Sequence, residues 1–305
     1  MRKLVPVLLM VCLMVSAFSG AWMAASAEAG TAALITNLSY IDDQDEDHML
    51  DLLTDTGADS SKPLILEIHG GGFFGGTKES LTAHAQVFAD AGFSVAMPNY
   101  THMPEASFKT IVQEIFTFMH WIEENADTYS LDLENVFMSG DSAGGYIVLL
   151  TAAVLASPEL QTYYEVTPPS FVVRGYALTC PVADLPALAE AYEGDAGFVT
   201  FMAGQMGEAV LKDEDSFNHA DLFQIIDPET FPEVYFLTTP TDTNFYSHSV
   251  ELDRFLTEKG IEHTCVEYTG TEGDLVHTFN IMKPEDSDSQ QANQEMIAYL
   301  CSKMD

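Results

Sequence analysis

Short apolar runs alternate along the chain with longer stretches whose apolar residues recur every three or four positions. The short runs predict eight β-strands, at 34–40, 49–53, 64–68, 94–98, 135–139, 172–179, 233–238 and 263–268. The longer stretches predict helices at 81–91, 107–127, 143–155, 246–259 and 289–303. Gly92 and Gly260 follow two of these stretches, at the position where helices commonly end. Strand and helix in alternation predict an α/β fold, with a mostly parallel eight-stranded sheet and helices on both faces.

Two segments depart from this alternation. The runs at 34–40 and 49–53 follow each other without a helix between them, which predicts an antiparallel start to the sheet. Residues 183–227 lie between the sixth and seventh runs and are irregular and rich in helical patterns. They predict a small helical insertion that acts as a lid or pocket wall. Because the chain has no internal repeats and no long low-complexity linkers, we expect residues 28–305 to form a single domain.

The first 27 residues have the pattern of a secretory signal peptide. Arg2 and Lys3 supply the positive start, an apolar run follows at 4–18, and 25–27 read Ala-Ser-Ala, a typical cleavage site. The apolar run is shorter than the roughly 20 residues that a membrane-spanning helix needs. We therefore expect cleavage, export and no stable membrane association afterwards. An uncleaved N-terminal anchor is the alternative.

The composition is strongly acidic, with 47 Asp and Glu against 11 Lys and Arg and a net charge of −36. Such a chain repels nucleic acid and anionic membrane surfaces, so neither is expected as a partner. The acidic segment 42–47 suggests a calcium loop. However, a loop of the EF-hand type starting at Asp43 needs Gly at position 48 and Glu at 54, where the chain has His48 and Thr54. No metal site is therefore expected.

Three cysteines remain after the leader, Cys180, Cys265 and Cys301. Their spacing matches no zinc or redox motif, and three cysteines do not make a disulfide framework. The sequence leaves two possibilities open, a disulfide between Cys265 and Cys301 or buried free thiols.

Residues 139–145 read Ser-Gly-Asp-Ser-Ala-Gly-Gly and contain the one G-x-S-x-G match of the chain, centred on Ser142. An apolar strand precedes the match and a helical pattern follows it, which is the strand–turn–helix context of a nucleophile elbow. So sharp a turn excludes bulk two residues before and after the serine, where Gly140 and Gly144 stand. The amide of Ala143 then lies at a helix N-terminus, where negative charge is favoured. The alternative is a small-residue turn with a capping serine.

A serine becomes a nucleophile only when a base takes its proton and an acid orients that base. On a sheet of this kind the chain order is serine, acid, histidine. Asp242 follows the seventh strand and His277 follows the eighth, so they are the candidate acid and base. Asp274 is the rival acid, three residues from the histidine. His248 is the rival base, but it falls within a predicted helix.

The stretch 66–76 reads Leu-Glu-Ile-His-Gly-Gly-Gly-Phe-Phe-Gly-Gly and has two interpretations. Gly70, Gly72 and Gly75 match the G-x-G-x-x-G fingerprint of dinucleotide binding, with Asp90 at a suitable distance. Starting from His69, the same stretch is an H-G-G-G loop that can build an oxyanion hole. The dinucleotide interpretation leaves the serine, acid and histidine unexplained, so we prefer the second.

In the preferred interpretation the glycines bring backbone N–H groups to an oxyanion with no side chain in the way. The expected donors are the amides of Gly70, Gly71 and Ala143. Gly72 shapes the loop, His69 orients it, and the glycines at 75 and 76 form the turn into the next helix.

Taken together, these motifs resemble the hormone-sensitive-lipase-like branch of the α/β-hydrolase esterases. The resemblance runs over roughly residues 34–303 and rests on H-G-G-G at 69–72, G-D-S-A-G-G at 140–145, Asp242, His277, and Tyr100 followed by Pro104-Glu105. The chain departs from the branch where Tyr-Thr-His at 100–102 replaces Tyr-Arg-Leu and where Thr-Asn follows Asp242. Because few residues separate Ala27 from the first strand run, an N-terminal helical cap is not expected. The first two departures leave the chemistry intact and the substrate class open.

The expected activity is that of a secreted serine carboxylesterase acting on small or short-chain esters, with no cofactor. Ser142 attacks the ester carbonyl, His277 takes the proton, and Asp242 holds the imidazole. The alternatives are an amidase, peptidase or formamidase-like hydrolase with the same triad, a non-catalytic secreted binding module, and a nicotinamide oxidoreductase. The acyl chain length and the oligomeric state stay open.

Overall fold

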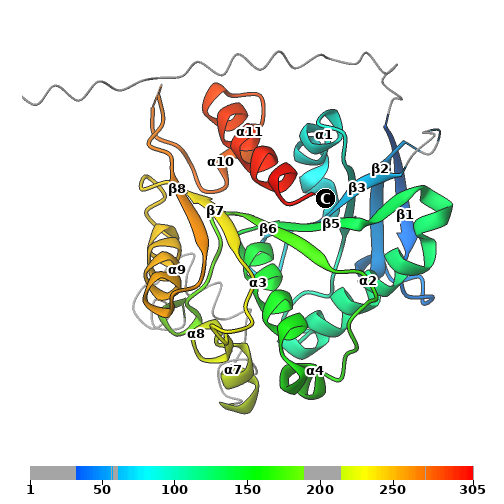
Figure 1. Cartoon of the computed structure of the whole chain (residues 1–305), viewed down its shortest axis with the longest axis horizontal. Coiled ribbons are helices and arrows are strands. Elements are labelled where there is room, and N and C mark those ends of the chain that lie inside the picture. The colour runs from blue at the N-terminus through cyan, green and yellow to red at the C-terminus, as the bar shows by residue number, and fades with distance from the viewer. Residues whose placement is uncertain (1–31, 56, 58–60, 189–213, 272, 305) are drawn as a thin grey trace, which may run out of the picture. The chain divides into compact units, whose positions relative to one another are not determined.

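An eight-stranded sheet forms the middle layer of the molecule in a computed structural model, which describes residues 32–55, 57, 61–188, 214–271 and 273–304 (Figure 1). The strands lie in the order β1-β2-β4-β3-β5-β6-β7-β8. All eight predicted strands are present, at Ala33–Ser39 (β1), Met49–Thr54 (β2), Lys62–Ile68 (β3), Ser94–Pro98 (β4), Leu131–Asp141 (β5), Val173–Thr179 (β6), Val234–Thr238 (β7) and His263–Glu267 (β8).

The pairing of the strands confirms the predicted mostly parallel sheet. β1 pairs with β2, and β2 with β4, in antiparallel fashion, while every later pair is parallel. Parallel strands are buried on both faces and therefore read as largely apolar runs, as β4 and the stretch 64–66 of β3 do. The antiparallel start follows from the absence of a crossover helix between the first two strands.

Helices cover both faces of the sheet and enclose two apolar cores. Leu64 and Leu66 of β3 point into one core, and Ile65 between them points into the other, because successive side chains of a strand alternate. The first core lies beneath α2 (Phe108–Tyr129), α3 (Ser142–Ala156), α4 (Pro158–Tyr164) and α9 (Tyr246–Lys259). The second lies beneath α1 (Thr82–Asp90), α10 (Phe279–Met282) and α11 (Ser287–Ser302).

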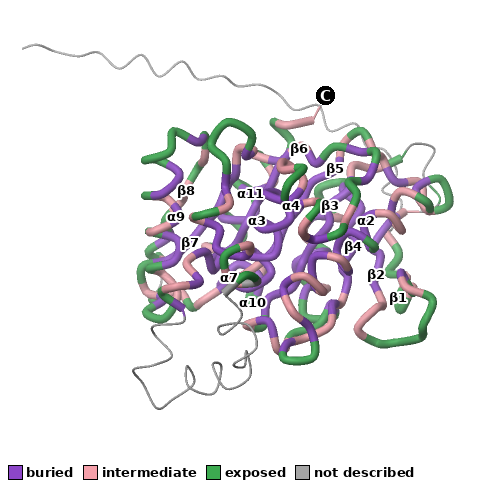
Figure 2. Tube along the Cα trace, turned by 90° about the horizontal axis from the view of Figure 1, so that it is seen from below, coloured by how far each residue is buried: buried purple, intermediate pink, exposed green. Residues whose placement is uncertain are grey.

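The helix α3 is buried from Ser142 to Val154, and the burial-coloured trace shows it in the interior (Figure 2). Its length and apolar character come from this central position. None of the described helices is by itself long and apolar enough to cross a membrane; α3 and α4 pass that test only as a pair, bent by 115°.

The predicted helical insertion is described only in part. The structure has two short helices near its end, α7 (Glu214–Ala220) and α8 (Leu222–Ile225). Residues 189–213 lie outside the described residues, as does the predicted signal peptide at 1–27. The described residues all belong to one compact unit. Four short elements escaped the pattern analysis, namely α4, α10, and the 3-10 turns η1 (Glu46–His48) and η2 (Lys78–Leu81).

The carboxyl ends of the central strands bring the predicted site residues together. β3 leads into the glycine loop, β5 ends directly at Ser142, β7 leads to Asp242, and the segment after β8 carries His277. Ligand sites of open parallel sheets lie at this edge. The fold thus places the glycine loop from Gly71 onward, Ser142 and His277 around one cavity.

Candidate active site

Ser142 occupies a sharp turn between β5 and α3. The strand ends at Asp141 and the helix begins at the next residue, with no loop between them. The serine has a φ of +51°, in the left-handed region that costs a non-glycine residue about 1–3 kcal/mol. A Cβ on Gly140 would lie 2.8 Å from the backbone of Gly144, and one on Gly144 would lie 2.1 Å from the carbonyl oxygen of Ile68. The turn therefore needs glycine at both positions, as expected.

His277 is paired with Asp242. Its Nδ1 lies 2.5 Å from the Asp242 Oδ2, and the carboxylate also accepts the amides of Asn244 at 3.3 Å and Phe245 at 3.2 Å. Asp242 is only 4% exposed. Burial opposes its ionisation, but the hydrogen bond and charge of His277 outweigh burial and hold the pKa of Asp242 below its usual value. The acid is thus ionised and fixed beside the imidazole.

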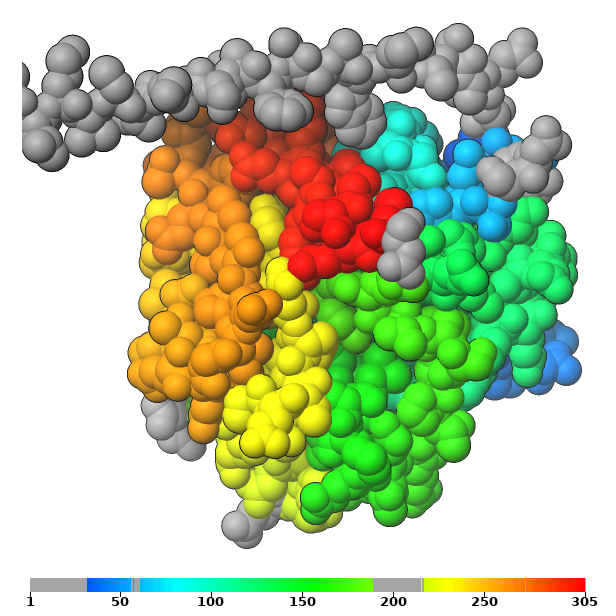
Figure 3. All heavy atoms as spheres, viewed as in Figure 1, coloured from blue at the N-terminus to red at the C-terminus, as the bar shows by residue number. Residues whose placement is uncertain are grey.

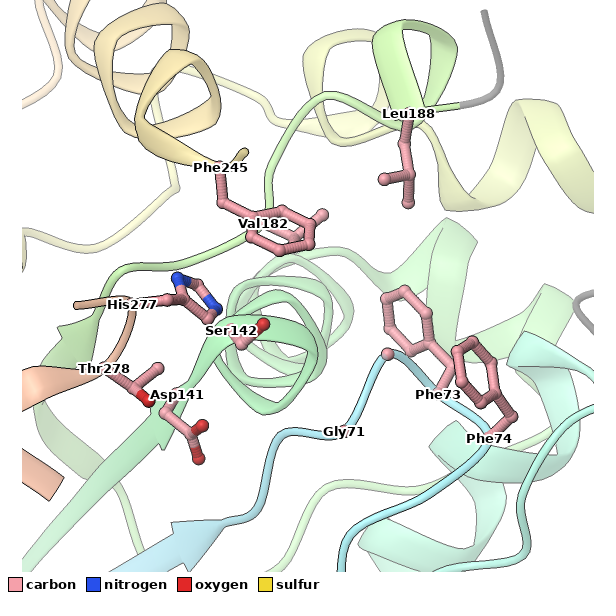
Figure 4. A pocket seen from close by; sticks show the side chains of 11 residues that line it. Gly71, Phe73, Phe74, Asp141, Ser142, Val182, Leu188, Phe245, His277 and Thr278 are labelled. Carbon is pink, nitrogen blue, oxygen red and sulfur yellow. The ribbon is translucent and has the colours of Figure 1, made fainter. Parts of the chain in front are cut away.

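The other ring nitrogen of His277 faces the serine. Nε2 is buried and has no hydrogen-bond partner among the described residues. Figure 4 shows the imidazole beside the Ser142 hydroxyl, and both residues line the same cavity. The structure therefore brings all three predicted residues together from β5, β7 and the segment after β8.

The rival residues lie elsewhere. Asp274 is exposed, and the carboxylate bonded to His277 is that of Asp242. His248 is buried in α9, where its Nδ1 accepts the amide of Asp184 at 3.2 Å and burial lowers its pKa. A neutral histidine that already accepts a backbone amide through Nδ1 is a structural residue of the helix.

His69 contacts the glycine loop through its imidazole ring. Its ring stacks on Tyr100 with centroids 4.4 Å apart, and its Nδ1 lies 2.7 Å from the carbonyl oxygen of Gly70. Burial lowers its pKa to about 4, so the ring is neutral and donates from Nδ1 to that carbonyl. This geometry agrees with the orienting role expected for it.

The expectation for Gly70 is wrong. Its amide donates to the Asp141 Oδ1 at 2.8 Å and is therefore not free for an oxyanion. The amides of Gly71 and Gly72 have no hydrogen-bond partner within the described part of the chain, and both residues line the cavity at φ values of +120° and +67°. Ala143 lies in the first turn of α3, whose N-cap residue Asp141 makes no side-chain bond to that turn. The free amides beside Ser142 are thus those of Gly71, Gly72 and Ala143.

Gly76 is also more than a turn into the next helix. It has a φ of +85°, and a Cβ there would lie 2.1 Å from the Gly70 carbonyl oxygen and 2.7 Å from the Nδ1 of His69. A Cβ on Gly71 would lie 2.1 Å from the carbonyl oxygen of Gly75. The loop folds back on itself, and its second pair of glycines closes it.

Asp141 is a further residue of the site, which the sequence motifs did not predict. Its carboxylate anchors the glycine loop through Gly70 and, in Figure 4, points away from the Ser142 hydroxyl. Burial raises its pKa to about 6, although the Gly70 amide and the charge of His277 oppose that rise. Its position directly before Ser142 was the available signal. A carboxylate buried in such a turn needs a hydrogen-bond donor, and the nearby glycine loop offers backbone amides.

The cavity beside Ser142 has a volume of about 320 Å³ and mostly apolar walls. Apart from the glycine loop, they are formed by the rings of Phe73, Phe74 and Phe245 and by Val182 and Leu188 (Figure 4). Val182 directly precedes the predicted insertion at 183–227, and Leu188 lies near its start. None of the cations in the described ranges lines the cavity.

Cys180 lies close to the catalytic candidates, and its thiol, Asp242 and His277 have potential ligand atoms within 4.8 Å of one another. Burial raises the pKa of this thiol to about 12, which disfavours the thiolate that binds metals. The 2.5 Å hydrogen bond between the other two residues leaves no space for an ion between them. Cys180, Cys265 and Cys301 are free thiols, so the alternative of a disulfide between the last two is wrong.

Comparison with known proteins identifies the family. Residues 65–279 match the family model described as alpha/beta hydrolase fold, and the chain belongs to that family. The crystal structure of esterase B from Lactobacillus rhamnosis (HN001) is similar, with a TM-score of 0.81 and 25% identity over 90% of this chain and 86% of that one. The predicted fold class and the resemblance to this group of enzymes are confirmed.

Curated relatives match over shorter stretches. Hormone-sensitive lipase of Mus musculus is 28% identical over 123 residues, which are 40% of this chain and 15% of that protein. The probable carboxylesterase 6 of Arabidopsis thaliana is 35% identical over 115 residues, 35% of this chain and 34% of that one. The acetyl esterase of Salmonella schwarzengrund (strain CVM19633) is 27% identical over 103 residues, 33% of this chain and 32% of that one. The chain thus spans between 15% and 34% of the length of these relatives.

Proposed function

We propose that the protein is a serine carboxylesterase that hydrolyses small or short-chain esters through an acyl-enzyme. One observation carries the proposal: a serine on a strained turn shares a cavity with a histidine whose far nitrogen is bonded to a buried carboxylate. This is the geometry that activates a hydroxyl for attack on a carbonyl. Esterases and carboxylesterases among its relatives support the same class.

In the proposed first step the Ser142 Oγ attacks the ester carbonyl carbon while the Nε2 of His277 takes the hydroxyl proton. Asp242 stabilises the imidazolium that forms. The carbonyl oxygen becomes an oxyanion and accepts the amides of Gly71, Gly72 and Ala143. Removing one such donor costs about 3–4 kcal/mol of transition-state stabilisation.

The tetrahedral intermediate then collapses. The bond to the leaving alkoxide breaks, and His277 returns its proton to that oxygen, so the alcohol departs and the acyl group stays on Ser142. A water molecule attacks the acyl-enzyme with the same base, and the acid is released. The residues of the site supply every proton transfer in both steps.

The walls of the cavity favour a small, neutral acyl group. They are apolar, the volume of about 320 Å³ is modest, and no described cation is present to bind an anionic substrate. The large negative net charge of the chain disfavours such substrates further. A role outside the cytoplasm is part of the proposal and is supported by the export pattern at 2–27.

A series of nitrophenyl esters from acetyl to octanoyl tests this function on the wild-type chain, Ser142→Ala and the surface control Ser302→Ala. We expect the highest kcat/KM on the shortest esters, a loss of at least about 10³-fold in Ser142→Ala, and no change in the control. Wild-type rates in Ser142→Ala would contradict the proposal. Faster cleavage of a matched nitroanilide than of its ester would favour the amidase alternative.

A further inference from the structure

A fully buried histidine–carboxylate pair lies between the sheet and α1, apart from the cavity. The Nδ1 of His84, on α1, is 2.5 Å from the Oε1 of Glu67, on β3. Both side chains are 0% exposed, so neither reaches substrate or solvent. Glu67 follows the apolar stretch 63–66 of β3, and its side chain points toward α1 and α11.

Further polar side chains extend this pair toward the segment of His277. The Nε2 of His84 lies 3.1 Å from the Oδ1 of Asn293 on α11. The Nδ2 of Asn280 donates to the same oxygen at 2.8 Å and to the Oγ1 of Thr179 at 3.2 Å. Asn293 donates in return to the carbonyl oxygen of Asn280 at 3.1 Å. We call Glu67, His84, Asn293, Asn280 and Thr179 the buried polar chain.

The hydrogen bonds show which atoms of the buried polar chain donate. The Oδ1 of Asn293 is an acceptor, because the amide nitrogen of that side chain already donates to Asn280. The Nε2 of His84 is therefore a donor. Beside an ionised Glu67 its Nδ1 donates as well, and the ring is then an imidazolium. Burial opposes this charge, but the Glu67 carboxylate outweighs it and raises the pKa of His84.

The two ends of the buried polar chain lie next to the two halves of the site. Glu67 is two residues before His69, which holds the glycine loop, and it pairs in register with Ser139 on β5. Asp141 follows on the same face of β5, and the charges of Glu67 and His84 both act on its carboxylate. Near the other end, Asn280, which donates to Thr179, is three residues after His277. Figures 1 and 3 show α1 and α11 side by side above the sheet.

We propose that Glu67 and His84 are positioning residues of the reaction, which tie the strand of the oxyanion loop to the segment of His277 through Asn293 and Asn280. This inference rests on the proposed function. The imidazolium of His84 balances the charge of Glu67 beside Asp141, so that Asp141 stays ionised and keeps the amide of Gly70.

Stability alone does not account for the pair. Taking two charges out of water has a large desolvation cost, and replacing a buried ion pair with apolar residues of similar volume is often neutral or stabilising. A pair kept only for folding would thus be replaceable without loss of activity. A pair that positions the site could not be replaced without loss of activity.

The decisive variant is the double substitution Glu67→Leu/His84→Met, which keeps side-chain volume and removes both charges. We expect its thermal unfolding temperature to stay at or above the wild-type value. Because a displacement of about 1 Å costs about 10²-fold in rate, we expect kcat on nitrophenyl acetate to fall roughly 10- to 100-fold, with KM changed less than about threefold. The control Ile65→Val, on the same face of β3, should lower the unfolding temperature and leave kcat unchanged.

A folded double variant with kcat within about twofold of wild type would overturn the proposal. If the double variant does not fold, Asn293→Ala tests the proposal instead. This substitution leaves the Glu67–His84 pair in place and removes the hydrogen bonds that link His84 to Asn280. A fall in kcat of at least about threefold at constant KM supports the proposal, and an unchanged kcat overturns it. Ser142→Ala, measured in parallel, separates this test from that of the function. Activity in Ser142→Ala refutes the function itself, whereas an inactive Ser142→Ala beside a fully active double variant refutes only the positioning role.

Discussion

Replacing Asp242 with Asn tests the pairing of the acid with His277. The substitution keeps the shape of the side chain and removes its charge. It also allows an amide N–H to face Nδ1, which would force the imidazole into the tautomer that cannot accept the serine proton. Asp242 lies behind the imidazole and is almost fully buried, so substrate binding should change little.

The size of the effect follows from the contact. With Nδ1 and Oδ2 2.5 Å apart, the centres of the two charges lie about 4 Å apart, and at an effective dielectric constant of about 20 their attraction is about 4 kcal/mol. At about 1.4 kcal/mol per tenfold change, kcat should fall about 10³-fold, and the tautomer error can raise the loss to about 10⁴-fold.

The assay is kcat and KM on nitrophenyl acetate for Asp242→Asn and for the matched control Asp274→Asn, whose carboxyl is exposed. We expect the control to stay within about twofold of wild type. A loss in the control equal to that in Asp242→Asn, or more than a tenth of wild-type kcat in Asp242→Asn, would refute the assignment of the acid.

The same variant has a pH signature in stability. The pKa of Asp242 is lower in the folded chain than its ordinary value, so the ionised carboxylate stabilises the fold above the unfolded-state pKa of about 4. That stabilisation is lost as the pH falls through the folded-state pKa. The difference in the free energy of unfolding between wild type and Asp242→Asn should therefore be largest at neutral pH and shrink in acid, as urea unfolding measures.

Gly76→Ala should lower the free energy of unfolding by more than the control Gly92→Ala. The new Cβ at position 76 would lie 2.1 Å from a loop carbonyl oxygen. At position 92 the φ of +99° also disfavours alanine, but a Cβ there would meet no atom within 4 Å. The control should cost about 1–2 kcal/mol in urea unfolding, and equal losses would contradict the close packing of the loop. Burial raises the pKa of Asp141 from 3.8 to about 6. Its ionised carboxylate therefore destabilises the folded state at neutral pH, and this destabilisation shrinks as the pH falls toward 4. The stability of Asp141→Asn relative to wild type should thus increase as the pH rises from 4 to 7, by up to about 3 kcal/mol, while its kcat is lower than that of wild type. A stability difference that does not change with pH would argue against a buried charge. Cys301 is the exposed thiol of the described chain, so Cys301→Ser should remove the fastest reaction with a thiol reagent under native conditions, and an unchanged rate would show that another cysteine reacts first.

The catalytic candidates could be predicted because their chemistry follows the order of the strands. Ser142 follows β5 without a gap, and the acid and the base follow later strands in the expected order. Strand periodicity also predicted the parallel sheet and its antiparallel start. These features depend on local patterns and on one topological rule, so a single sequence is enough to find them.

The oxyanion donors could not be predicted as well, because they depend on contacts between distant segments. The amide of Gly70 is not an oxyanion donor, because it donates to Asp141, 71 residues later in the chain. The buried polar chain likewise joins positions 67, 84, 280 and 293. Glu67 in an otherwise apolar run was the available signal. The signal peptide at 1–27 and the lid role of the insertion at 183–227 stay predictions, since residues 1–31 and 189–213 lie outside the described residues.

Covalent labelling of the serine tests the central claim most directly. A nitrophenyl phosphonate transfers its phosphonyl group to an activated serine and releases nitrophenolate, and intact-mass spectrometry counts the adducts on each chain. We expect one adduct per wild-type chain, located on the peptide that contains Ser142, loss of ester hydrolysis in step with labelling, and no adduct on Ser142→Ala. Labelling of Ser142→Ala to the same extent, or an adduct on another residue with hydrolysis intact, would contradict the assignment of Ser142 as the nucleophile.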